Sequence, residues 1–204
     1  IHRCQKDGVK IVMNCEVTPE LIKEEKPDSV IIATGSKTLI LPIEGIDNPA
    51  IIHGSDLLDG KRPAGKKVLV VGGGMVGCET AAFLGEQEHD VTVIEFRDTV
   101  GADVIHEHRV YLMKDFEDYG IKEITGAKVC KFYEDGVEYE TADGVRHESR
   151  GYDSVILSMG FRNYNPLEEK IKDLVPETHV IGDAIRARRA LDATKEAYEV
   201  ASRI

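Results

Sequence analysis

Apolar residues along this chain gather in short, nearly uninterrupted runs that have the length of β-strands. Such runs occupy residues 29–33, 67–71 and 91–94, with the sequences SVIIA, KVLVV and VTVI. Runs of this kind are typical of strands that are buried on both faces, as in a parallel sheet. Residues 78–86 carry small side chains on one side, which predicts a helix between the second run and the third. The order strand, helix, strand predicts an α/β fold with a central parallel sheet.

The period of the pattern changes to two in the second half of the chain. Alternating apolar and polar residues there predict three short strands, at 128–133, 137–140 and 145–149. Asp-Gly pairs at 135–136 and 143–144 separate these strands and are typical of tight hairpin turns. A further apolar run follows at 154–157. The sequence therefore predicts a three-strand antiparallel meander that leads back to one more strand.

The remaining segments show weaker patterns. An apolar run at 9–13 predicts a short strand, and Thr18 before Pro19 predicts the start of a helix. Residues 37–66 contain several prolines and glycines, which indicates a connection rather than a core element. Longer helices are expected over residues 103–119 and 187–204.

Composition and charge narrow the classes of function. The chain has 204 residues and a formal net charge of −11, which disfavours binding to nucleic acid and to anionic membranes. No apolar run approaches the length of a membrane span, and the first residues contain no apolar signal core. The first residue is not methionine, so we expect a piece of a longer protein.

The four cysteines do not form a recognisable pair or cluster. Cys4, Cys15, Cys78 and Cys130 show neither Cys-x-x-Cys spacing nor the spacing of a metal site. This favours reduced thiols in a cytoplasmic protein and argues against a redox-active disulfide. We expect no metal ligands in this chain.

The pattern with the clearest chemistry is a glycine-rich loop between a strand and a helix. Gly72, Gly74 and Gly77 fit G-x-G-x-x-G, and Glu95 lies 21 residues after Gly74, at the end of the next strand. The first glycine permits a tight turn, the second lets a pyrophosphate approach the backbone, and the third lets the helix pack on the strand. The helix N-terminus then offers N–H groups to the phosphates. The spacing predicts a dinucleotide site.

The residues after the second strand bear on the choice of nucleotide. The Glu95 carboxylate can accept hydrogen bonds from ribose hydroxyls and would repel a 2′-phosphate, which favours NADH over NADPH. Arg97 leaves NADPH open, because an arginine at this place can accommodate the phosphate. Glu79 has two interpretations: a carboxylate that complements the helix dipole, or a contact near the nicotinamide.

The order of these motifs resembles that of the two-dinucleotide flavoprotein reductases, in which an NAD(P)H domain is inserted into an FAD domain. The motifs are Ala-Thr-Gly at 33–35, the glycine loop, Ser-Met-Gly at 158–160 and Ile-Gly-Asp at 181–183. More narrowly, the chain is similar to the C-terminal part of 2-enoate reductases and 2,4-dienoyl-CoA reductases, relatives of trimethylamine dehydrogenase. Phrases typical of that group are VTPE at 17–20 and PDSVIIATG at 27–35.

The resemblance implies where two cofactors would bind. Met75, Val76 and Glu79 match positions along the nicotinamide half, and Gly160 matches the wall beneath the dinucleotide. Asp183 matches an aspartate that contacts the flavin ribityl or pyrophosphate. The complete set expected to contact NAD(H) is Gly72, Gly73, Gly74, Met75, Val76, Gly77, Glu79, Glu95, Phe96, Arg97 and Gly160. The set expected to contact FAD is Thr34, Gly35, Gly182 and Asp183.

The resemblance also implies a division of the chain and a function. Residues 1–61 would be part of an FAD domain with a linker, residues 62–160 an inserted Rossmann-like NAD(H) domain, and residues 161–204 the return to the FAD domain. The chain would pass hydride from NADH to a flavin, for reduction of an activated C=C bond by an enzyme with an N-terminal barrel. That barrel and the first glycine fingerprint of the FAD domain are not in this sequence, so flavin retention is not expected. Two alternatives are a stand-alone NADH:flavin or disulfide reductase and a non-catalytic NAD(H)-binding module.

Overall fold

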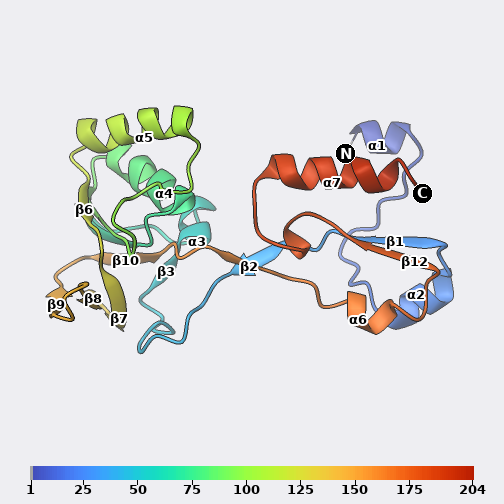
Figure 1. The fold of residues 1–204 in the computed structure, drawn as a ribbon, viewed down its shortest axis with the longest axis horizontal. Helices are drawn as coiled ribbons and strands as arrows, with labels where there is room; N and C mark the ends of the chain where they lie inside the picture. The colour runs from blue at the N-terminus through green and yellow to red at the C-terminus, as the bar shows by residue number, and fades with distance from the viewer. Residues whose placement is uncertain (1) are drawn as a thin grey trace. The chain divides into compact units, whose positions relative to one another are not determined.

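The computed structural model describes residues 2–204, which divide into two compact units. One, here called the inserted unit, is Thr38–Phe161, and the other, the flanking unit, combines the residues up to Lys37 with Arg162–Ile204 (Figure 1). The two connecting segments, β2 (Ser36–Thr38) and β11 (Phe161–Asn163), pair with each other. In sequence, one unit therefore interrupts the other.

The inserted unit is built on a five-stranded sheet in which every neighbouring pair is parallel. Its strands, in spatial order, are β3 (Ile52–His53), β10 (Ser154–Leu157), β4 (Lys67–Val71), β5 (Asp90–Ile94) and β6 (Lys122–Ile124). Its helices are α3 (Gly54–Leu58), α4 (Met75–Glu86) and α5 (His106–Asp118). A separate antiparallel meander comprises β7 (Lys128–Tyr133), β8 (Gly136–Glu140) and β9 (Arg146–Ser149). The predicted α/β class, with a central parallel sheet and a three-strand meander, is confirmed.

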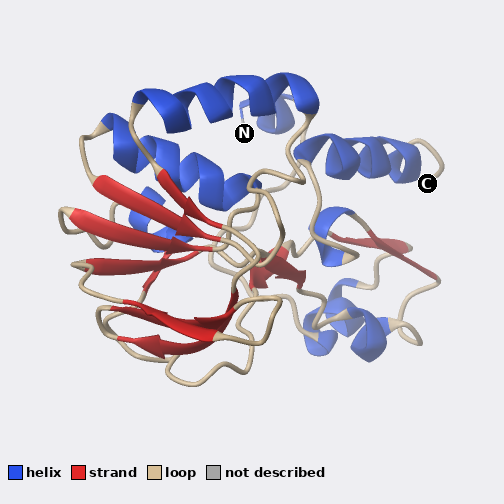
Figure 2. Cartoon of the chain, turned by 60° about the vertical axis from the view of Figure 1, so that its left-hand side comes forward, coloured by secondary structure: helices blue, strands red, loops and turns tan. Residues whose placement is uncertain are grey.

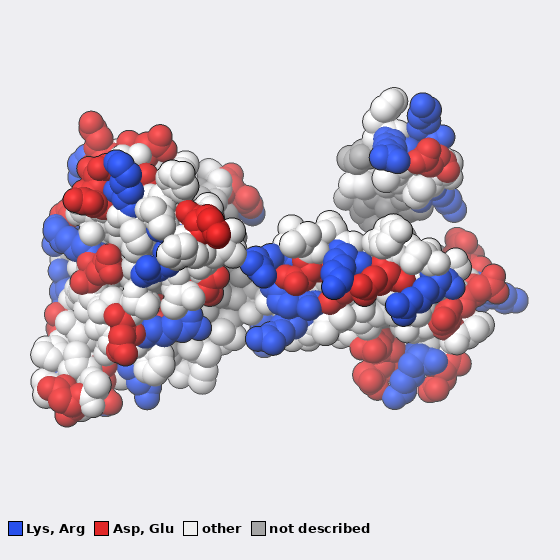
Figure 3. All heavy atoms as spheres, turned by 45° about the horizontal axis from the view of Figure 1, so that its top comes forward, with Lys and Arg blue, Asp and Glu red and all other residues white. Residues whose placement is uncertain are grey.

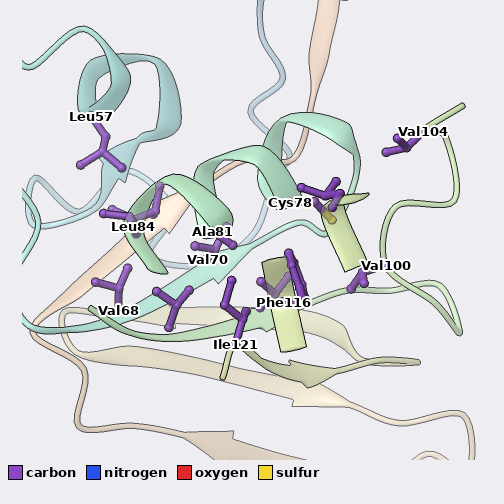
Figure 4. Packing of buried hydrophobic residues seen from close by; sticks show 14 of the residues in the cluster. Leu57, Val68, Val70, Cys78, Ala81, Leu84, Val100, Val104, Phe116 and Ile121 are labelled. Carbon is purple, nitrogen blue, oxygen red and sulfur yellow. The ribbon is translucent and has the colours of Figure 1, made fainter. Parts of the chain in front are cut away.

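The strand β4 lies between two hydrophobic layers. Val68 and Val70 belong to a core shared with α4 and α5, whereas Leu69 and Val71 belong to a second core shared with the meander. All four side chains are at most 1% exposed. Helices cover one face of the sheet and the meander lies at the other (Figure 2), and Figure 4 shows the core on the helical side. Burial on both faces is the reason that this strand has no polar alternation in its sequence.

The flanking unit contains a smaller sheet, in which β1 (Ser29–Ile32) pairs in parallel with β12 (Glu177–Val180). Its helical segments are α1 (His2–Lys6), α2 (Pro19–Glu25), α6 (Glu168–Ile171), a 3₁₀ turn at Gly182–Ala184 and α7 (Ala190–Ala201). The helix α2 begins as expected, because the Thr18 hydroxyl accepts a hydrogen bond from the Leu21 N–H at 3.3 Å. The core of this unit consists of Ile22, Ile32, Leu167, Ile171 and Val175.

One predicted strand is wrong. Residues 9–13 have no regular secondary structure, and Val9, Val12 and Met13 are 54%, 59% and 73% exposed. A strand needs a neighbour that satisfies its backbone N–H and C=O groups, and no strand among residues 2–204 pairs with this segment. An apolar run by itself does not supply that neighbour.

Several short elements were not predicted. Residues 37–66, expected to be a connection with one short helix at 56–58, contain that helix as α3 and also the strand β3, which was not expected. The buried side chains of Ile51, Ile52 and Leu57 belong to the cores of the inserted unit. The strand β6 completes the sheet at one edge. The predicted helix at 78–86 begins earlier, at Met75, and the one at 103–119 begins later, at His106.

The surface carries charges of both signs. Basic and acidic side chains are interspersed on the face seen in Figure 3 and form no broad area of one sign. Within residues 2–204, every helix is too short or too polar to cross a lipid bilayer.

The core beneath α5 permits a direct test of the layered packing. We expect Phe116→Ala to lower the free energy of unfolding by about 3–5 kcal/mol, because the side chain is 3% exposed and its loss leaves a cavity. Tyr111→Ala on the same helix is the control, since Tyr111 is 73% exposed and its removal is expected to cost at most about 0.5 kcal/mol. Urea unfolding followed by circular dichroism measures both; equal losses would contradict the packing.

Candidate dinucleotide-binding site

The glycine-rich loop lies at the carboxyl edge of the parallel sheet. The strand β4 ends at Val71, and α4 begins at Met75, which leaves Gly72, Gly73 and Gly74 as the connection. In the sheet register, Val71 lies opposite Ile94 of β5 and Leu157 of β10. The residues that follow these two strands, Glu95 and Ser158, are therefore placed on either side of the loop. Ligands of open α/β sheets bind at this edge.

Two of the glycines are required by close backbone contacts. A methyl group on Gly72, which has a φ of +104°, would lie 2.4 Å from the carbonyl oxygen of Ser158. A methyl group on Gly77 would lie 1.8 Å from the carbonyl oxygen of Gly72. No other residue fits either position. The tight turn and the close helix–strand packing expected from the sequence are both present.

Glu95 is fixed against the loop by backbone groups. Its carboxylate accepts a hydrogen bond from the Gly73 N–H at 2.6 Å and another from the Arg97 N–H at 2.9 Å. The side chain of Phe96 is 68% exposed and that of Arg97 is exposed. The structure thus places Glu95 beside the loop, as the spacing predicted, and leaves its neighbours accessible.

The N-terminus of α4 differs from the expectation of N–H groups open to a phosphate. The Met75 N–H donates a hydrogen bond to the Asp103 carboxylate, at 3.0 Å. A methyl group on Gly74 would lie 3.3 Å and 3.5 Å from the two oxygens of that carboxylate. In the sequence, Asp103 is expected only in the first turn of a helix. No local signal identifies this contact, because it arises when residues after β5 fold back on the loop.

Glu79 lies on α4 and faces the neighbouring helix α5. Its carboxylate oxygen is 3.6 Å from Nε2 of His108, and both side chains are about half exposed. The two carry opposite charges when the imidazole is protonated.

A small cavity is lined by Val76 and Gly160, two of the residues expected near the nicotinamide. Its volume is about 10 Å³, which is close to the space needed by one water molecule. Its lining residues are Thr38, Gly54, Ser55, Val76, Leu157, Ser158, Gly160 and Phe161. The buried Ser158 hydroxyl has no hydrogen-bond partner among the described residues. In the sequence, Ser158 stands out only as part of the Ser-Met-Gly motif, because a single serine after a strand predicts no function by itself.

The four residues expected at a flavin lie in the flanking unit. The Asp183 carboxylate accepts hydrogen bonds from the Ser36 hydroxyl and from the Arg188 N–H, both at 3.0 Å. The backbone of Gly35 turns with a φ of +75°, and its carbonyl oxygen accepts a hydrogen bond from the Tyr164 N–H. The hydroxyl of Thr34 donates to the Tyr164 carbonyl oxygen.

Next to Asp183, a second carboxylate holds the turn that contains Gly182. The Gly182 N–H donates to Glu196 at 2.7 Å, and the Arg188 guanidinium pairs with the same carboxylate. The hydrogen bond from Arg188, followed by that from Gly182, lowers the pKa of Glu196. The Glu196 carboxylate is therefore negatively charged at neutral pH.

Cys78 lies beneath the loop as a buried thiol. Its Sγ–H donates to the carbonyl oxygen of Gly73 at 3.3 Å. Burial, above all other causes, raises the pKa of this thiol from its ordinary value of 9.0 to about 12. Of the other cysteines, Cys4 and Cys15 are exposed and Cys130 is partly buried, and none of the four forms a disulfide.

Comparison with known proteins identifies the family. The model of the pyridine nucleotide-disulphide oxidoreductase family matches residues 1–175. The chain belongs to this family. The predicted resemblance is confirmed, because the chain also matches C-terminal parts of enoate-reductase-type enzymes.

Curated relatives place the chain more narrowly. It is 31% identical over 200 residues to cinnamate reductase of Clostridium sporogenes, and the aligned region covers 97% of this chain and 30% of that protein. It is 33% identical over 186 residues to bilirubin reductase of Mediterraneibacter gnavus, and the aligned region covers 90% of this chain and 28% of that protein. The solved structure of 2-naphthoyl-CoA reductase, in complex with 2-naphthoyl-CoA, matches all of this chain and 31% of its own, with 31% identity and a TM-score of 0.90.

These matches establish a general class of function. The chain is the NAD(P)- and FAD-binding region of a flavin oxidoreductase and is homologous to enoate-type reductases, and its family depends on NAD(P)H. It spans about 30% of the length of the relatives described here.

The burial of Cys78 predicts unequal thiol reactivity. At pH 8, we expect Cys4 and Cys15 to react with a maleimide within minutes and Cys78 to react only after unfolding, because its thiolate is scarcely populated. Since the pKa is higher in the folded chain, ionisation of this thiol favours unfolding as the pH rises above about 9. Mass spectrometry of labelled peptides, with and without guanidinium, measures the difference. Rapid labelling of folded Cys78 would contradict the placement.

Proposed function

We propose that this chain is the NADH-binding portion of a flavin-dependent oxidoreductase. In the full-length enzyme it delivers hydride from NADH to FAD, for reduction of an activated C=C bond of the 2-enoate or dienoyl type. The observation that carries the proposal is the loop from Gly72 to Gly77 with the Glu95 carboxylate held against the Gly73 amide.

The residues around the loop fit a dinucleotide. The Gly72 turn lies at the carboxyl edge of the sheet, and Gly74 has no side chain where a pyrophosphate would approach. Glu95 is positioned to accept hydrogen bonds from the adenosine ribose, which supports NADH as the nucleotide. Val76 and Gly160, both expected along the nicotinamide half, line the same small cavity. Bound NADH supplies the hydride, and the residues of this chain bind and orient it without an acid or base of their own.

The flavin half of the proposal is supported by the flanking unit. Thr34, Gly35, Gly182 and Asp183 would contact FAD there, together with sequence from elsewhere in the full-length protein and next to an N-terminal barrel. Relatives named cinnamate reductase and 2-naphthoyl-CoA reductase support an unsaturated acid or thioester as the final acceptor. We propose a cytoplasmic enzyme in which residues 62–160 hold the nicotinamide cofactor.

A second candidate is a stand-alone NADH oxidase. A relative named NADH oxidase, from Thermoanaerobacter brockii, is 32% identical over 202 residues. The same match covers only 31% of that protein. It therefore supports NADH oxidation as an activity but does not support the idea that this chain performs it alone. Disulfide reduction has less support, because none of the cysteines forms a close pair in sequence.

The nucleotide preference can be tested by calorimetry. We expect the chain to bind NADH more tightly than NADPH and Glu95→Arg to shift the ratio of the two dissociation constants toward NADPH by about tenfold, or about 1.4 kcal/mol. The physical reason is that the carboxylate of Glu95 repels a 2′-phosphate, whereas a guanidinium at the same position attracts it. Glu117→Arg, an exposed site on α5 with the same change of charge, is the control. An unchanged ratio in Glu95→Arg would sink the assignment of Glu95.

Flavin content separates the two candidate functions. We expect the purified chain to be colourless and to consume no NADH in air, because part of the FAD site is supplied by other sequence. The measurement is the visible absorbance of the purified chain in the region of the flavin bands. A bound chromophore that NADH bleaches would favour the stand-alone oxidase instead.

A further inference from the structure

The side chain of Asp103 lies against the second glycine of the loop. Its carboxylate accepts the hydrogen bond of the Met75 N–H at 3.0 Å, and both of its oxygens lie within 3.5 Å of the place where a side chain on Gly74 would begin. This is the space that the glycine leaves open. Met75 is the first residue of α4, where the partial positive charge of the helix is concentrated.

The segment that carries Asp103 is firmly attached to the loop. The Gly101 N–H donates to the Gly73 carbonyl oxygen at 2.7 Å. Val100 and Val104, on either side, are 1% and 9% exposed and belong to the core beneath α4. The Arg109 guanidinium donates to the Val100 carbonyl oxygen at 3.1 Å. The backbone on the N-terminal side of Asp103 is therefore fixed by these contacts, whereas the Asp103 side chain is exposed and can turn away from the Met75 amide.

A pyrophosphate that uses the same helix end meets this carboxylate. Two anions at one amide repel each other, and a single N–H cannot serve both at full strength. The other carboxylate beside the loop, Glu95, is in a different position, because it binds the Gly73 amide and faces the ribose side in the proposed function. Asp103 instead accepts from the amide at the helix end, where the phosphates of the proposed function would bind.

We propose that Asp103 is an affinity-determining residue of the dinucleotide site: its carboxylate competes with the pyrophosphate for the Met75 amide and so weakens binding. This inference rests on the proposed function. Displacement of the carboxylate from the Met75 amide accompanies binding, so part of the binding energy is spent on moving it. The consequence is a dinucleotide that is held loosely and released readily after it has been oxidised.

The test is the affinity of the full chain for NADH with and without this charge. Asp103→Asn keeps an oxygen that can accept from the Met75 amide but removes the charge, and we expect the dissociation constant to fall about tenfold. Glu107→Gln, a neighbouring exposed site in the first turn of α5, removes the same charge and is expected to change it less than about twofold. Asp103→Ala, with folding checked by thermal melting, is a second variant that clears the position and is expected to bind at least as tightly as Asp103→Asn.

A comparison of NADH with adenosine shows whether the phosphates are the cause of the change in affinity. Adenosine has no phosphate, so its affinity is expected to be the same in the wild-type chain and in Asp103→Asn. An equal gain for adenosine and NADH would overturn the inference, and so would equal NADH affinity in wild type, Asp103→Asn and Asp103→Ala. In both of these cases the proposed function stands. Failure of wild type and of every variant to bind NADH would instead overturn the proposed function, and the inference with it.

Discussion

The contact between the backbones of Gly72 and Gly77 is the constraint on which the site depends. Any side chain at position 77 would lie within 1.8 Å of the Gly72 carbonyl oxygen, so the helix α4 can pack this closely only with glycine there. That packing fixes the direction of the helix and hence the direction in which its first N–H groups point. Glu95 and Asp103 can accept their hydrogen bonds from the loop and the helix end only when this contact is made.

The sheet beneath the loop gives the contact its rigidity. The strand β4 is buried on both faces, with α4 and α5 on one side and the meander on the other. Burial of this kind ties the end of the strand to two cores at once, so the loop begins from a fixed point. The parallel register then brings the ends of β5 and β10 to either side of it. A binding site at the edge of a sheet needs such a base, because a shift of about one ångström weakens a preorganised site.

Two carboxylates accept hydrogen bonds from backbone amides at the loop, and in the proposed function they have opposite effects on a dinucleotide. Glu95 binds the Gly73 amide from the end of β5 and would suit the sugar hydroxyls. Asp103 binds the Met75 amide from a segment that folds back after β5 and would oppose the phosphates. The local field of the loop is therefore a balance between a helix end that attracts anions and a side chain that already supplies one.

The sequence by itself determined the class of fold, the glycine loop and the place of Glu95, because each follows from the hydrophobic pattern and the residue spacing of one strand–helix–strand unit. Strand–helix–strand order and the spacing of Gly72, Gly74 and Gly77 are local properties, and the turn between β4 and α4 permits few alternatives. Only the tertiary structure decided that residues 9–13 form no strand, that residues 38–61 belong to the inserted unit, and that Asp103 reaches the Met75 amide. Each of these depends on a partner distant in sequence: a neighbouring strand, a shared core, or a backbone amide 28 residues away.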